Sequence, residues 1–307
     1  MGGSLNEAER PGQSPVSATH ARPVALSVVI DGRMDGARAH QVATLTRRLG
    51  LAGVWLRYPW WPLGGTGANG TDVAGLLAAL APAPPGLGLG LIVDADAADA
   101  AGGPSAADDA WLDGLVPAAG SLTAGQPVSP RIALAGKPQA IARWHGLIGR
   151  RPGLAVARIA LPAGDPGRPA AAVFVPWVPG RNLPAEVSAA ASAAAGRPVL
   201  AEVTVSVGRT AAEARARADA DELFTLAGHP AEQGLFGTLE ECQATAARLA
   251  QAGATELVCY LPLAADLPDV LAQLRSIAIG AAVLRPGAPP SAAPPPPAGW
   301  GGRRLPA

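Results

Sequence analysis

This chain of 307 residues has few cysteines and few aromatic residues. It also lacks an excess of either charge sign and long apolar runs. Its two cysteines have no CxxC spacing, which argues against a disulfide framework and favours a reducing, cytoplasmic compartment. Basic and acidic residues both number 24, so no net charge attracts nucleic acid or an anionic membrane surface. No run reaches the roughly 18 apolar residues of a membrane span, and no signal peptide is recognisable. We therefore expect a cytoplasmic protein with a small-molecule partner, and neither nucleic acid nor membrane.

Several motifs of catalysis and cofactor binding are missing as well. The sequence has no Ser-His-Asp order, no H-E-x-x-H and no Walker A loop, so hydrolase chemistry and a metal site have little support. The glycines of GLGLG at 86–90 have the wrong spacing for a dinucleotide fingerprint, and they enter a strand instead of leaving one. We interpret them as structural, at a bulge or a close approach of the backbone.

Short apolar runs alternate with helix-like stretches, which is typical of βαβ units around a parallel sheet. This order predicts an α/β protein, a TIM-type (β/α)8 barrel over 23–285 whose middle is irregular. Residues 95–130 are mostly small, and we expect a barrel strand to be missing there. Strands are expected at 25–31, 53–58, 87–93, 131–134, 155–161, 172–178, 199–207 and 256–261.

The two ends of the chain lack these patterns. Residues 1–22 show no periodicity, and 286–307 form a proline-rich tail that cannot make ladder or helix hydrogen bonds. Both segments are expected to be disordered. The PPPP run has no recognition motif around it, so we favour a solvated tail over a polyproline segment that binds a partner.

The C-terminal part carries the clearest local signals. Thr238 and Glu241 have the spacing of a capping box and predict a helix that ends before Gly253. Asp266 can cap a last helix, which follows the strand at 256–261.

The same region resembles a known family. Thr210, Glu213 and Ala214 follow a strand, then come Gly-Thr-x-Glu-Glu at 237–241, an Ala-Gly step at 252–253 and a final strand. This succession is similar to the end of the luciferase-like family of flavin- or deazaflavin-dependent oxidoreductases. The likeness extends more loosely over 23–280. It implies a barrel enzyme, an oxidoreductase or monooxygenase, that uses a deazaflavin (coenzyme F420) or FMN on a small organic substrate. Family members often dimerise, so a homodimer is an expectation.

Two departures from the family pattern keep a second hypothesis open. Ala170–Ala172 stands where the family usually has Ala-Asp-Gly, and the Gly-rich region of the fourth strand is missing between 95 and 130. Backbone amides of such loops receive a cofactor's phosphate. The alternative is a degenerate, non-catalytic barrel that acts as a binding or scaffold protein.

Candidate site residues come from the ends of the expected strands, because barrels place function at the carboxyl ends of their strands. Aromatic rings after the second strand either stack a tricyclic cofactor or only cap the barrel mouth. Gly136 and Lys137 either cradle a phosphate or form an ordinary solvent-exposed loop. His145 is interpreted as a surface or packing residue. The candidate cofactor-binding residues are Asp31, Arg57, Tyr58, Trp60, Asp94, Gly136, Lys137 and Trp177. The catalytic residues and the substrate are not predicted.

Overall fold

The computed structural model describes residues 24–58, 73–80, 87–100, 112, 131–151, 154, 157–163, 170–178, 180–221, 224, 233–262 and 266–284. Both terminal segments that were expected to be disordered lie outside this part of the chain. None of the helices within it is long and apolar enough to cross a membrane. It also contains no group of three His, Cys, Asp or Glu side chains arranged to hold a metal ion.

The described elements alternate between strands and helices along most of the chain. The strands are β1 (Ala25–Ile30), β2 (Gly53–Tyr58), β3 (Gly88–Asp94), β4 (Arg131–Ala135), β5 (Arg158–Leu161), β6 (Ala172–Val175), β7 (Val199–Val207), β8 (Leu235–Gly237) and β9 (Glu256–Tyr260). The helices are α1 (Gly36–Arg48), α2 (Val73–Leu80), α3 (Ala95–Ala100), α5 (Pro138–Gly149), α6 (Leu183–Ala193), α7 (Ala211–Asp219), α9 (Leu239–Gln251) and α10 (Leu267–Val283).

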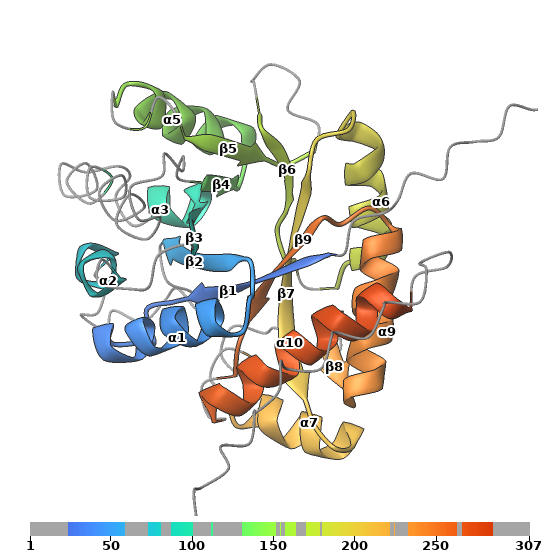
Figure 1. Ribbon diagram of the computed structural model, residues 1–307. Helices are drawn as coiled ribbons and strands as arrows, with labels where there is room; N and C mark the ends of the chain where they lie inside the picture. Colours follow the sequence, from blue (N-terminus) through green and yellow to red (C-terminus); the bar gives the residue numbers. More distant parts are fainter. Residues whose placement is uncertain are drawn as a thin grey trace, which may run out of the picture.

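Eight parallel strands close into a barrel, and the helices lie around it (Figure 1). The strands β1 to β6 pair in chain order, β6 pairs with β7, and β9 closes the ring between β7 and β1. The TIM-type barrel predicted from the sequence is confirmed.

The expected gap in the barrel does not exist. β3 pairs directly with β4, with Leu91 opposite Ile132, so no strand is needed from 95–130. The prediction of a missing strand was wrong because the eight apolar runs found elsewhere are enough to close the ring. The short strand β8 was not predicted. It pairs only with the end of β7, from Val205 to Val207, and lies beside the closed ring.

Side chains alternate between the barrel interior and the helix layer. On β1, Leu26, Val28 and Ile30 pack toward the helices, whereas Val29 points inward. The interior cluster contains Val29, Trp55, Ile92, Ala133, Ala135, Ala160, Ala172, Phe174, Leu200, Ala218, Phe224, Val258 and Tyr260. Since small and large residues share this interior, it is a packed core and not a pore.

A polar plug fills the amino-terminal end of the barrel. Glu256, the first residue of β9, accepts hydrogen bonds from Ser27 Oγ at 2.6 Å and Trp55 Nε1 at 3.0 Å. It also pairs with Arg131 at 2.6 Å. The Arg131 guanidinium lies 4.5 Å from the centre of the Trp55 ring, a cation–π distance. The amino-terminal end of the barrel is therefore closed by groups that bond to Glu256, while Nη2 of Arg131 is buried without a hydrogen-bond partner among the described residues.

Close packing explains the glycines of β3. A Cβ on Gly90 would lie 2.2 Å from Cε3 of Trp55, so only glycine leaves room for this buried ring. The structural interpretation of the GLGLG run is confirmed at this position.

Replacing Gly90 with alanine should therefore destabilise the barrel. The added methyl group has to push the Trp55 ring out of a filled interior, and overpacking of this kind costs about 1–3 kcal/mol. Gly146→Ala is the matched control, because a Cβ there meets nothing within 4 Å and helix α5 should gain about 0.5–1 kcal/mol. Urea unfolding of both variants measures the difference. Equal stability of G90A and the wild type would show that this packing argument is wrong.

Candidate functional site

Charged and aromatic side chains gather at the carboxyl ends of the barrel strands. Asp31 follows β1, Arg57 and Tyr58 end β2, and Asp94 ends β3. Gly136 and Lys137 follow β4, and Trp177 lies just after β6. Trp60 lies outside the described residues. The remaining predicted site residues therefore all lie at the end of the barrel where such folds carry out their chemistry.

A buried arginine organises the centre of this end. Nη1 of Arg57 donates to Oε1 of Glu202 and to the hydroxyl oxygen of Tyr260, both at 2.6 Å. Nη2 of Arg57 pairs with Oδ2 of Asp94 at 3.2 Å. The Tyr260 hydroxyl donates to the same Glu202 oxygen at 2.5 Å. We call Arg57, Asp94, Glu202 and Tyr260 the Arg57 network.

The remaining oxygen of Glu202 extends this network to β6. It accepts the backbone N–H of Trp177 at 3.0 Å. Of the predicted site residues, the structure thus brings Arg57 and Asp94 into direct contact and joins Trp177 to them through Glu202. Tyr58 points elsewhere: its ring packs against Trp144 on α5, with ring centres 6.0 Å apart.

Burial sets the protonation states in the Arg57 network. Burial disfavours the charge of Arg57, but Tyr260, Glu202 and Asp94 outweigh this and raise the pKa of Arg57 above its already high ordinary value. Burial, reinforced by Glu202, also raises the pKa of the Tyr260 phenol well above 10, although Arg57 acts in the opposite direction. At neutral pH the site therefore holds a fixed cation next to a neutral phenol.

A second buried ion cluster lies after β1. The Asp31 carboxylate accepts the Arg33 backbone N–H and its Nε, each at 3.0 Å, and pairs with Nη2 at 2.8 Å. Nη1 of Arg33 pairs with Asp221, beyond α7, at 2.5 Å. Burial raises the pKa of Asp31, and Arg33 opposes this. Asp31 was predicted to contact a cofactor, whereas the structure buries it in a cluster that ties the loop after β1 to the segment after α7.

The predicted phosphate cradle lies in a cleft at the same end of the barrel as the Arg57 network. The cleft has a volume of about 530 Å³ and lies between the ends of β4, β5 and β6 and helix α6, so we call it the β4–β6 cleft. Gly136 has a positive φ of 124°, and the backbone N–H of Lys137 donates to Oδ2 of Asp96 at 2.9 Å. That amide, which we expected to receive a phosphate, is therefore bound to a carboxylate of the chain itself.

The other walls of the β4–β6 cleft are both apolar and charged. Phe174 and Pro176 line it on the barrel side, and Pro162 lines it after β5. Arg181 lines the α6 side and pairs with Glu186 at 3.3 Å. Since the Arg181 side chain is 61% exposed, this pair contributes little to stability and can exchange for another anion.

Two members of the Arg57 network, Glu202 and Tyr260, were not predicted from the sequence. Both lie on buried, largely apolar strands, at positions that alternate with outward-facing residues. Glu202 carried a signal, because a carboxylate in the middle of a nine-residue buried strand requires a partner. Tyr260 had no such signal, since a tyrosine at the end of a buried strand is common in packed cores.

Comparison with known proteins finds solved structures with a similar fold and no match in sequence. No family model matches the sequence, and no curated protein matches it. Among solved structures, the monooxygenase RslO1 from Streptomyces bottropensis has a TM-score of 0.58 at 13% identity, over 84% of this chain and 98% of that one. The coenzyme F420 dependent tetrahydromethanopterin reductase from Methanopyrus kandleri has a TM-score of 0.53 at 11% identity, over 83% and 98%. The structure of apo-MsnO8 has a TM-score of 0.51 at 17% identity, over 84% and 98%.

The chain shares the fold of these proteins. At this level of identity the likeness extends to the fold alone. It agrees with the resemblance seen in the sequence, since a monooxygenase and an F420-dependent reductase are among the proteins with this barrel.

Replacing Tyr260 with phenylalanine should flatten the alkaline pH dependence of stability. The unfolded chain releases the phenol proton near pH 10, whereas the folded protein, with its raised pKa, keeps it. The resulting stabilisation is complete below about pH 10 and is lost as pH rises toward the folded-state pKa. Above about pH 10, the free energy of unfolding should fall by about 1.4 kcal/mol per pH unit more in the wild type than in Y260F. Urea unfolding at several alkaline pH values measures this, and parallel curves would contradict a buried neutral phenol.

Proposed function

We propose that the chain is a luciferase-like oxidoreductase or monooxygenase that binds a deazaflavin or FMN at the carboxyl end of the barrel and acts on a small organic substrate. The observation that carries the proposal is the Arg57 network. Buried ion pairs add little net stability, so a buried cation with three partners at this end of a barrel is a candidate functional site. The fold likeness to oxidoreductases supports the same reaction class.

The β4–β6 cleft fits a cofactor of this kind in size and in the chemistry of its walls. Its volume of about 530 Å³ lies within the usual range for ligand sites. Pro162 and Pro176 offer apolar surface to a flat ring system, and Lys137 and Arg181 are cations suited to a phosphate. When bound, the cofactor's ring would supply the hydride or oxygen chemistry.

The chain's own residues would position the reactants and control charge. The cleft and the Arg57 network both lie at the carboxyl ends of the barrel strands, since Asp96 in the cleft follows β3 and Asp94 of the network ends it. Arg57 would stabilise negative charge that develops on a bound ring or substrate, and Glu202 keeps the guanidinium oriented. Tyr260, which is neutral, fixes Glu202 and does not serve as a base.

A non-catalytic binding or scaffold barrel is the second candidate function. The observation that favours it is that the Lys137 amide is bound to Asp96 and the Arg181 side chain is paired with Glu186. A phosphate would have to compete with both carboxylates. The replacement of Ala-Asp-Gly by Ala170–Ala172 points in the same direction.

Titration with FMN and a deazaflavin in parallel, followed by absorbance and fluorescence, separates the two candidates. We expect saturable binding of one of them. Lys137→Gln should weaken it about tenfold by removing a charge-assisted contact, and Lys137→Arg should restore most of the affinity. Because Lys137 is the only lysine of the chain, protection of its amine from acylation by bound cofactor gives a second readout. Failure of both cofactors to bind would favour the scaffold.

A further inference from the structure

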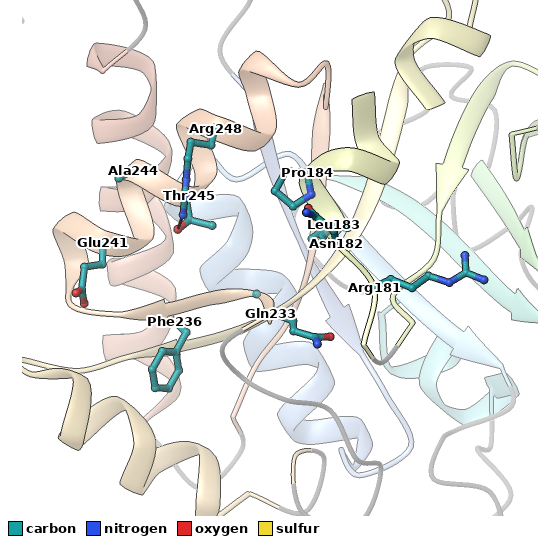
Figure 2. Close-up of a pocket in the computed structure, with 11 residues that line it drawn as sticks. Arg181, Asn182, Leu183, Pro184, Gln233, Phe236, Glu241, Ala244, Thr245 and Arg248 are labelled. Carbon is teal, nitrogen blue, oxygen red and sulfur yellow. Dashed lines mark hydrogen bonds between the residues drawn. The ribbon is translucent and has the colours of Figure 1, made fainter. Parts of the chain in front are cut away.

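A second cleft opens between helices α6 and α9, at the same end of the molecule but outside the barrel ring. Its volume is about 660 Å³. The start of α6 forms one wall, the face of α9 from Glu241 to Arg248 forms the other, and the residues around β8 form the floor (Figure 2). We call it the α6–α9 cleft. Apart from Arg181, its lining shares no residue with that of the β4–β6 cleft.

The shape of this cleft is fixed by rigid elements. α6 and α9 touch near their carboxyl ends, where a Cβ on Gly253 would lie 2.4 Å from that of Ala191, and the cleft lies between the start of α6 and the α9 face from Glu241 to Arg248. In the floor, Gly234 approaches Thr204 so closely that a Cβ would lie 2.1 Å from its carbonyl oxygen. The Gln233 side chain accepts the backbone N–H of Gly180 at 3.1 Å and so joins the floor to the loop before α6. The cleft is thus formed before any ligand arrives.

The charge in the cleft comes from side chains and not from helix ends. Asn182 caps α6, and the capping box of Thr238 and Glu241 caps α9, so the first amides of both helices already have acceptors. Arg248 lines the α9 wall, where its Nη2 donates to Thr245 Oγ1 at 2.9 Å. Within the described part of the chain, no carboxylate lies within ion-pair distance of Arg248. An exposed guanidinium on this wall therefore keeps its charge for an anion.

The rest of the lining suits an apolar body attached to that anion. Leu183 and Pro184 face α9 across the cleft, whereas the Phe236 ring points to the other side of β8, toward Arg215 on α7 (Figure 2). Arg181 extends away from α9 toward Glu186, whereas the Arg248 side chain lies along the α9 wall over Thr245 (Figure 2). Guanidinium groups bind phosphate and carboxylate oxygens in a bidentate manner, and apolar walls such as Pro184 and Leu183 exclude water from an apolar group.

We propose that the α6–α9 cleft is a second binding site, separate from the cofactor cleft, for a small organic phosphate with an apolar or aromatic body. Arg248 and Thr245 hold the phosphate, and Pro184 and Leu183 contact the body. The site does not depend on the proposed function, because none of these residues lines the β4–β6 cleft.

Calorimetric titration with phenyl phosphate tests this site, with inorganic phosphate as the probe that lacks a body. We expect phenyl phosphate to bind more tightly than inorganic phosphate. Arg248→Gln should weaken phenyl phosphate at least about tenfold. Arg158→Gln, at an exposed arginine at the start of β5, is the matched control and should bind as the wild type does.

A second variant removes the free charge without removing the arginine. Ala244 is exposed on the cleft wall one turn before Arg248, so Ala244→Glu places a carboxylate at the i, i+4 distance that favours an ion pair. This variant should fold normally and lose phenyl phosphate as R248Q does. Undiminished binding in both variants, or equal affinity for phosphate and phenyl phosphate, would overturn the proposal.

Cofactor titrations with the same variants keep the two clefts apart. R248Q and A244E should bind FMN and deazaflavin as the wild type does, whereas K137Q should bind phenyl phosphate normally. Competition between phenyl phosphate and a cofactor would assign the α6–α9 cleft to that cofactor and overturn the claim of a separate ligand. Binding of phenyl phosphate by a protein that binds neither cofactor would support this site and contradict the proposed function.

Discussion

The carboxyl end of the barrel depends on the charge of one buried arginine. Transfer of the Arg57 guanidinium out of water costs several kcal/mol, so it is tolerated only where acceptors surround it. Those acceptors come from β3, β7 and β9, in the form of Asp94, Glu202 and Tyr260. Because Glu202 also holds the amide of Trp177, the same cation fixes the chain after β6. The relative positions of these strand ends follow from the need to satisfy Arg57.

Both ends of the barrel hold buried or half-buried ion pairs. At the amino end, Glu256 is fully occupied by Ser27, Trp55 and Arg131, which closes the barrel. At the carboxyl end, the Arg57 network likewise joins a cation to carboxylates, and the β4–β6 cleft opens at this end. Exposure does not separate the two clusters, since the Asp94 side chain is 25% exposed and that of Arg131 is 23% exposed. We propose the reaction at the Arg57 network because barrels carry their function at the carboxyl ends of their strands.

Local sequence signals predicted much of the fold because they act over short distances. Thr238 and Glu241 form the predicted capping box, with the Thr238 amide 2.7 Å from Glu241 Oε2. The eight barrel strands were predicted from their apolar runs. The structural role of Gly90 was predicted too, and it leaves room for the Trp55 ring. The candidate site was predicted only in part, since strand ends are visible in a sequence but their partners are not. Glu202 lies 145 residues from Arg57, and Asp96 lies 41 residues from Lys137, so neither pairing leaves a local pattern. The three-residue strand β8 is too short for any periodicity.

Cofactor binding at the carboxyl end of the barrel is tested most directly by a crystal structure of the protein grown with deazaflavin or FMN. We expect density for a tricyclic ring in the β4–β6 cleft, with the phosphate within hydrogen-bond distance of Lys137. A ring bound elsewhere, or a β4–β6 cleft without cofactor density at saturating concentration, would show that this cleft is not the cofactor site.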